Sequence, residues 1–281
     1  MERLPLPQQL VQQAAEYADG SRVPVEPRDA ATVVLLRPSG DGPEVYLLRR
    51  QASMEFAAGM CVFPGGGVDP RDFDHSVAWA GPSPSAWAGR LGTDERMARA
   101  LVCAAVRETF EESGVLLAGT ADSVVADTTG ADWEADRVAL EARELSLTDV
   151  LDRRGLVLRS DLLGAWAAWL TPEFEPRRYR TWFFVAALPE GQVTRDVSTE
   201  SSSVMWLPVP DATARADAGE VFMMPPTYLT CLDVDRHGSP GDVLAEAANR
   251  EVTMFMPEVV SVDGDHFLSM PPGSEALVAD R

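Results

Sequence analysis

The sequence lacks lysine, so the 24 basic residues in a chain of 281 are all arginines. Without lysine there is no group to form a Schiff base, to anchor pyridoxal phosphate or to serve a P-loop. Arginine still suits phosphate, because its planar guanidinium donates two parallel hydrogen bonds to an oxyanion. Lysine chemistry is therefore excluded, whereas binding of a phosphate-bearing small molecule is not.

Cysteine and histidine are scarce. The cysteines are far apart and form no C-x-x-C pair, which predicts buried thiols and argues against a zinc site, a redox pair or a disulfide framework. The histidines lack metal-ligand spacing such as H-E-x-x-H, and we expect them at the surface. No G-x-S-x-G motif is present, which argues against that type of serine hydrolase. The residues are Cys61, Cys103 and Cys231, and His75, His237 and His266.

Long apolar runs are also missing. No stretch approaches the roughly 18 apolar residues that cross a bilayer. Residues 1–20 contain Glu2, Glu16 and Asp19 and no apolar stretch of the signal-peptide type. We therefore expect a soluble, cytoplasmic protein without a membrane partner.

The charge balance is strongly acidic, with a formal net charge of -20 at pH 7. Such a chain repels the nucleic-acid backbone, so we expect no nucleic-acid partner. It repels anionic small molecules as well. A phosphate-bearing substrate therefore needs cations gathered at its site.

Hydrophobic patterning predicts mixed α/β structure. Apolar, β-branched segments at 31–37 and 44–50 flank a Gly- and Pro-rich turn, which predicts a β-hairpin. A helix is predicted from Thr93 or Asp94, as its cap, to about Ser113, with Gly114 as its terminator. Further strands are predicted at 115–117, 166–170, 181–188 and 203–207, and further helices at 8–17, 132–154 with a new start at 147, 210–219, 225–235 and 242–250.

The helix predicted to end near Ser113 carries Glu108, Glu111 and Glu112, which share one face at spacings i, i+3 and i+4. Like charges at this spacing cost about 0.2–0.5 kcal/mol per pair, and acids in a last turn oppose the helix dipole by about 0.3–1 kcal/mol each. A bound hard cation such as Mg²⁺ would reverse both effects. Arg107, one turn before Glu111, can orient that carboxylate. The alternative is a solvated acidic face in a chain with 44 acids.

A glycine-rich turn, Phe63-Pro-Gly-Gly-Gly67, precedes this helix. Glycines there let backbone N–H groups approach a ligand closely, although a plain tight turn is the alternative. The combination of a strand, this turn and R-E-x-x-E-E-x-G on a helix is far more specific than either part.

Together the two parts resemble the Nudix box, G-x5-E-x7-R-E-U-x-E-E-x-G-U, where U is aliphatic. Asp72 follows Gly66 at the place of the first glutamate, and Thr109 stands where an aliphatic residue is usual. Residues 73–106 lie between the two halves where the family has seven, so an insertion at about 70–93 splits the box. The second half is matched at Arg107, Glu108, Glu111, Glu112, Gly114 and Val115.

The split box resembles that of a Nudix subgroup related to the mammalian peroxisomal coenzyme A diphosphatase, nucleoside diphosphate-linked moiety X motif 19. The resemblance implies a Nudix fold: a single α/β (α+β) domain over residues 1–281, with a mixed β-sheet sandwiched between helices, a helical insertion and added helices in the C-terminal part. Further segments that look alike are LLRRQASMEF (47–56), WLTP (169–172), RRYRTWFF (177–184) and MMPPT (223–227).

The resemblance also implies Mg²⁺ or Mn²⁺ and attack of water on a phosphorus atom. By carry-over, Glu108, Glu111 and Glu112 are the metal ligands, with Glu111 either a ligand or a base. Arg107 and Glu111 are catalytic candidates. The family often uses a further glutamate outside the box. Glu200 is our candidate, although it equally fits a solvated loop acid.

Arginines are the candidates for holding substrate phosphates. Arg177, Arg178 and Arg180 cluster in an acidic chain, although ordinary pairing with surface acids explains them as well. Because neighbours on a strand alternate faces, one of Arg49 and Arg50 faces the site. The substrate-binding candidates are Arg50, Gly65, Gly66, Gly67 and Arg178.

The leading hypothesis is a hydrolase that cleaves the pyrophosphate of coenzyme A or acyl-coenzyme A, giving 3′,5′-ADP and (acyl-)4′-phosphopantetheine. A Nudix hydrolase of ADP-ribose, a nucleotide sugar or a dinucleotide is the alternative enzyme. A non-catalytic, Nudix-like ligand-binding module is the alternative from another class. The partner expected is a small-molecule nucleotide, and a homodimer is left open.

Overall fold

The computed structural model describes residues 5–40, 42–51 and 57–279, so part of the 47–56 segment lies outside it. Its elements are a mixture of strands and helices. In chain order they are α1 (Gln8–Ala18), β1 (Arg28–Ser39), β2 (Gly42–Arg50), β3 (Cys61–Val62), β4 (Gly65–Gly67), the 3-10 helix η1 (Pro70–Phe73), β5 (Trp79–Ala80), α2 (Pro84–Leu91), α3 (Glu95–Ser113), β6 (Ala118–Gly119), α4 (Ala131–Glu141), α5 (Leu147–Arg154), β7 (Val157–Arg159), the 3-10 helix η2 (Ser160–Leu162), β8 (Leu163–Leu170), β9 (Tyr179–Ala187), β10 (Ser201–Pro208), α6 (Val209–Asp217), α7 (Pro225–Val234), α8 (Pro240–Ala247), β11 (Met254–Phe255), β12 (Val259–Val262), β13 (Asp265–Leu268) and α9 (Glu275–Ala279).

A mixed sheet forms the centre, with strand order β10-β2-β1-β9-β8-β11. β1 is antiparallel to β2, as the predicted hairpin requires, and parallel to β9. The short strand β4 pairs antiparallel with β1, so that Gly66 lies opposite Ala31. This pairing fixes the glycine turn to a rigid strand.

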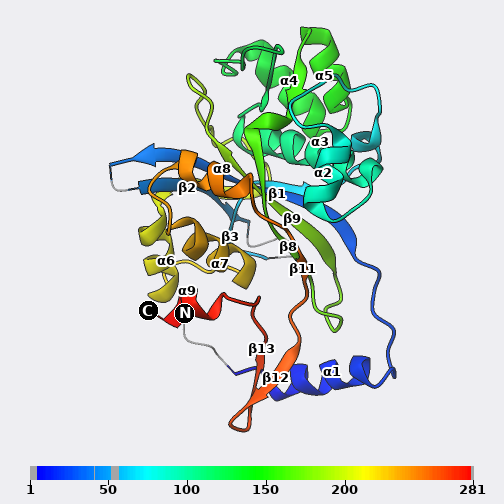
Figure 1. Cartoon of the computed structure of the whole chain (residues 1–281), viewed down its shortest axis with the longest axis vertical. Helices are drawn as coiled ribbons and strands as arrows, with labels where there is room; N and C mark the ends of the chain where they lie inside the picture. The colour runs from blue at the N-terminus through cyan, green and yellow to red at the C-terminus, as the bar shows by residue number, and fades with distance from the viewer. Residues whose placement is uncertain (1–4, 41, 52–56, 280–281) are drawn as a thin grey trace.

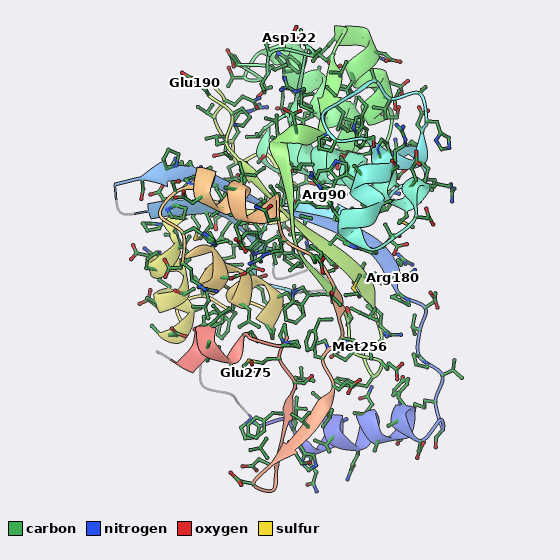
Figure 2. All side chains as sticks on the ribbon, in the orientation of Figure 1. Arg90, Asp122, Arg180, Glu190, Met256 and Glu275 are labelled. Atoms are coloured by element: carbon green, nitrogen blue, oxygen red, sulfur yellow. The ribbon has the colours of Figure 1, made fainter. Side chains whose placement is uncertain are left out.

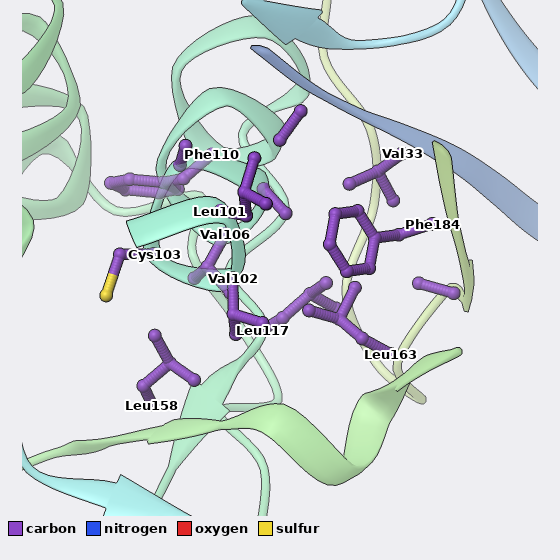
Figure 3. Close-up of a cluster of buried hydrophobic side chains, with 14 of the residues drawn as sticks. Val33, Leu101, Val102, Cys103, Val106, Phe110, Leu117, Leu158, Leu163 and Phe184 are labelled. Carbon is purple, nitrogen blue, oxygen red and sulfur yellow. The ribbon is translucent and has the colours of Figure 1, made fainter. Parts of the chain in front are cut away.

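Helices cover both faces of the sheet, as the Nudix resemblance implied. Figure 1 shows α2 to α5 on one side of the strands and α6 and α7 on the other. Alternate residues of β1 point to opposite sides, as in any strand: Val33 joins the core under α3, and Val34 joins the core over α6 to α8. Figure 3 shows the first core, with Leu101, Val106 and Phe110 on α3 and Val33 of β1 beside Phe184 of β9. The core thus holds α3 against the sheet.

The insertion expected at about 70–93 includes a helix, α2, and its sequence explains both ends. Ser83 accepts a hydrogen bond from the Ala86 N–H at the N-terminus, and Gly92 takes a left-handed φ of 63° at the C-terminus. Trp87 is fully buried in the core shared with α3. The insertion is therefore packed against the helix that carries the acids.

The strand predicted to begin at 115–117 begins later in the structure. These residues are buried, but the short strand β6 begins only at Ala118. The backbone groups of Leu116 are taken by a side chain instead. Gln192 accepts from the Leu116 N–H at 2.9 Å and donates to its carbonyl at 2.9 Å. An amide side chain satisfies the buried backbone here in place of a sheet partner.

The prediction of buried thiols is confirmed. Cys61, Cys103 and Cys231 are all free and buried. Over the ranges that the structure describes, every helix is too short or too polar to cross a membrane. The single-domain assignment stays a prediction.

Candidate active site

Helix α3 presents the acidic residues, and its ends follow from local sequence. Asp94 caps the start by accepting the Met97 N–H at 2.8 Å, and Gly114 ends it with a left-handed φ of 74°. Glu111 and Glu112 are buried, with 9% and 8% of their surface exposed. The last turn contains no basic residue. The helix therefore buries acids at its negative end with no basic residue in the same turn, which its own stability does not favour.

Arg107 joins the two halves of the split box. Its Nε and Nη2 donate to the two carboxylate oxygens of Asp72 at 3.0 and 2.9 Å, so the pair is bidentate and buried. Its Nη1 donates to Glu108 at 2.7 Å and to Glu111 at 3.3 Å. The insertion therefore leaves Asp72 beside the acidic helix, where it holds the arginine that orients two of the glutamates.

The glycine turn lies directly against the acids. The Gly65 N–H donates to Glu112 Oε2 at 2.8 Å, and the Gly67 carbonyl accepts from Arg107 Nη2 at 2.9 Å. A Cβ on Gly66 would stand 2.5 Å from Glu108 Oε1, closer than any side chain allows. The turn thus needs glycine in order to admit the Glu108 carboxylate.

On this face of α3, burial and repulsion between neighbouring carboxylates raise the pKa values of the glutamates. The pKa of Glu111 is raised to about 7, chiefly by burial and next by the charge of Glu108, while Arg107 opposes the rise. Burial also raises the pKa of Glu112 well above its ordinary value, again with a contribution from Glu108. The carboxylates of Asp72, Glu108 and Glu111 thus share one guanidinium, that of Arg107, whereas Glu112 accepts the Gly65 N–H.

These groups suit a hard divalent cation. Such ions prefer carboxylate oxygens, and a cation would offset the surplus negative charge. In the part of the chain that the structure describes, no three acidic, cysteine or histidine side chains stand as a ready ligand cluster. Glu108 and Glu111 form ion pairs with Arg107, and Glu112 accepts a hydrogen bond from the Gly65 N–H.

Glu200 and Arg50 come together next to the acidic face. Arg50 Nη2 lies 3.2 Å from Glu200 Oε2. The charge of Glu200 contributes to the raised pKa of both Glu108 and Glu112, and Arg50 lowers that of Glu112. The structure therefore brings both candidates to the neighbourhood of the box, although Glu200 is distant from it in sequence.

Arg178 has different partners from those expected. It is buried and donates to the carbonyls of Thr171 at 3.1 Å and Val25 at 3.0 Å. It also contacts the sulfur of Met256, which Figure 2 shows between the sheet and the β12–β13 hairpin. Its guanidinium therefore holds together the chain segments at Val25, Thr171 and Met256, and its role in substrate binding stays a prediction.

Sequence reasoning missed Arg137, which lies on α4. Its Nη1 donates to the Glu111 carbonyl at 2.7 Å, at the end of α3. No local signal marks it, because the contact depends on how α4 packs against α3.

Comparisons with known proteins agree with this geometry. The family model described as NUDT19 Nudix domain matches residues 93–233. A crystal structure of a Nudix hydrolase from Alicyclobacillus acidocaldarius superposes with a TM-score of 0.68 at 27% identity, covering 79% of this chain and 96% of that one. The chain is a Nudix hydrolase, an enzyme of the pyrophosphohydrolase class.

Within that class the chain belongs to the NUDT19 Nudix family. It is 26% identical to the acyl-coenzyme A diphosphatase NUDT19 of Homo sapiens over 295 residues, covering 90% of this chain and 77% of that protein. It is 27% identical to the putative Nudix hydrolase 7 of Caenorhabditis elegans over 204 residues. That match covers 71% of this chain and 57% of the nematode protein.

Proposed function

We propose that this protein cleaves the pyrophosphate bond of coenzyme A or acyl-coenzyme A, giving 3′,5′-ADP and (acyl-)4′-phosphopantetheine. The observation that carries the proposal is the face formed by Glu108, Glu111 and Glu112, joined through Arg107 to Asp72. The name of the human relative, an acyl-coenzyme A diphosphatase, supports the substrate class.

Glu108, Glu111 and Glu112 would hold Mg²⁺ or Mn²⁺. A divalent ion held there would offset phosphate charge and lower the pKa of a bound water. Arg107 keeps Glu108 and Glu111 aligned through its Nη1. The carboxylates of Glu111 and Glu200 are the proposed acceptors for a water proton. For Glu111 the pKa raised to about 7 suits this role, since a general base works best when its pKa lies near the operating pH.

The reaction itself is a displacement at phosphorus. Water oxygen forms a new P–O bond, its proton passes to a carboxylate, and the bridging P–O bond breaks to release the second phosphate. Gly65, Gly66 and Gly67 bring the backbone close to the acids, and Arg50 supplies a cation beside them. These residues are the proposed contacts for the substrate phosphates.

Product analysis tests the proposal. The purified protein is incubated with Mg²⁺ or Mn²⁺ and separately with coenzyme A, acetyl-coenzyme A, ADP-ribose, a nucleotide sugar and a diadenosine polyphosphate. We expect 3′,5′-ADP from the coenzyme A substrates. Cleavage of another compound alone would remove the coenzyme A assignment and keep the hydrolase. No metal-dependent turnover would favour a ligand-binding module.

Two variants and a matched control assign the site. Glu111→Gln and Glu112→Gln should lower kcat by roughly 100-fold or more, since even groups that only orient metal ligands contribute about 10–100-fold. Glu44→Gln is the control, because Glu44 is also a half-buried acid paired with an arginine, Arg37, but lies on β2. Equal loss in all three variants would contradict the assignment.

A further inference from the structure

Helix α4 packs against the C-terminal end of α3, where backbone carbonyls lack helical partners. Arg137 is 3% exposed, and its Nη1 donates to the Glu111 carbonyl at 2.7 Å. Its Nη2 also pairs with Glu134 at 2.7 Å. Because α3 has no basic residue in its last turn, Arg137 supplies the positive charge that its negative end needs.

The same arginine connects α3 to a distant segment through Glu141. One oxygen of Glu141 accepts from Arg137 Nη1 at 3.0 Å. The other accepts from the Thr199 hydroxyl at 2.6 Å and from the Thr199 N–H at 3.3 Å. Glu141 therefore uses both carboxylate oxygens to bridge the end of α3 and the residue before Glu200.

Glu200 depends on its backbone for its position. Its side chain is 54% exposed, and its ion pair with Arg50 at 3.2 Å is of the exposed kind that contributes little. The backbone is held more firmly. The Gln51 N–H donates to the Glu200 carbonyl at 3.0 Å, and the Gln51 side chain donates to the Thr199 carbonyl at 2.7 Å. Glu141 holds the other side of this segment.

We propose that Arg137, Glu141 and Thr199 are positioning residues that set Glu200 relative to the metal-binding face of α3. The contacts form one path: Glu111 carbonyl, Arg137, Glu141, Thr199, Glu200. The two ends of this path are the two parts of the proposed active site, so a shift of Glu200 changes its distance from the acids. The proposal rests on the proposed function of Glu200.

Thr199→Val tests the path, because it removes the hydroxyl donor and keeps the shape of the side chain. Thr199→Ser restores the donor. Thr129→Val is the matched control: Thr129 is also exposed, and its hydroxyl donates to Asp127 at 2.6 Å. Glu200→Gln, alone and combined with Thr199→Val, shows whether Thr199 acts through Glu200.

We expect Thr199→Val to lower kcat by roughly 10-fold with KM changed by less than about 2-fold, since misplacement of a catalytic group affects the transition state most. Thr199→Ser and Thr129→Val should keep the kcat of the unchanged protein. In the Glu200→Gln background, Thr199→Val should cause no further loss, because coupled residues are not additive. An equal 10-fold loss in that background, or no loss in Thr199→Val alone, would overturn the proposal.

Mn²⁺ affinity gives a readout that needs no turnover. Because Glu200 adds negative charge near Glu108 and Glu112, Glu200→Gln should weaken Mn²⁺ binding several-fold. Thr199→Val should also weaken Mn²⁺ binding, but the double variant should bind Mn²⁺ no more weakly than Glu200→Gln alone. If no substrate is turned over but the variants still show these changes in Mn²⁺ affinity, the result would count against the proposed function and support the positioning path. Unchanged Mn²⁺ affinity in Thr199→Val would count against the path itself.

Discussion

Asp72→Asn is the substitution for which the structure gives the most definite expectation. Asp72 is 3% exposed, and each of its oxygens accepts one hydrogen bond from Arg107, at 3.0 and 2.9 Å. The oxygen that faces Nη2 also accepts the Asp69 N–H at 2.8 Å. Asparagine keeps one acceptor and turns an N–H₂ group toward donors, so at least one charge-assisted bond is lost and a buried donor is left unpaired.

The expected cost follows from those contacts. A hydrogen bond to a charged group contributes about 1.5–3 kcal/mol, and breaking a buried ion pair costs about 3–5 kcal/mol. Because one acceptor remains, we expect Asp72→Asn to lower the free energy of unfolding by about 2–4 kcal/mol. Activity should fall by about 10–100-fold, as for other groups that orient metal ligands, because Arg107 aligns Glu108 and Glu111 less well.

Urea unfolding measures the stability change, and initial rates with a coenzyme A substrate measure the activity. Asp74→Asn is the control, since Asp74 follows the same 3-10 helix but accepts from Ser76 at the surface. We expect the control to change stability by less than about 1 kcal/mol. If Asp72→Asn unfolds at the same urea concentration as the unchanged protein, Asp72 does not hold Arg107 in solution, and the two halves of the box are not joined as described.

Three further substitutions probe the same region. Gly66→Ala should abolish activity, because its Cβ would meet the Glu108 carboxylate, whereas Gly89→Ala, which meets no atom within 4 Å, should leave rates unchanged in the same assay. Asp69→Asn should destabilise the protein at pH 7. Arg71 lowers the pKa of Asp69 to about 2, so its contribution is present above the unfolded pKa of roughly 4 and disappears as pH falls through about 2. Thermal melts of both proteins between pH 2 and 7 should converge at the acid end, and a constant gap would contradict the shift. In the metal-free protein, Glu111→Gln should raise the free energy of unfolding, relative to the unchanged protein, more at pH 8 than at pH 5. The pKa of Glu111 is raised to about 7, so the unchanged protein loses stability as pH rises through 7, and equal differences at both pH values would refute this.

The sequence predicts the elements around the site well, because their signals are local. Asp94 and Gly114 sit at the two ends of α3 as capping chemistry requires. The hairpin of β1 and β2 follows from two apolar strands around a Gly- and Pro-rich turn. These features need only neighbouring residues, and a single sequence contains them.

The contacts that assemble the site are not local, and the sequence carries no signal for them. Gln192 replaces a sheet partner for Leu116, so a pattern that reads as a strand at 115–117 is not one. Arg178 looks like a phosphate ligand in an acidic chain but donates to Val25 and Thr171. Such outcomes depend on which loops meet after folding.

The split of the box shows why an insertion is tolerated at this point of the fold. In this chain α3 begins at Glu95, about three turns and roughly 18 Å before Arg107. A link of seven residues from Asp72 could not include those turns. The insertion therefore supplies the extra turns at the start of α3 and the chain that connects Asp72 to them. The extra turns are covered by α2, whose Trp87 is fully buried. Because the cost of closing a loop grows slowly with its length, the bidentate pair of Asp72 and Arg107 can survive the insertion. The C-terminal end of α3, which carries the acids, thus keeps its position beside Asp72 although the insertion adds turns at the N-terminal end.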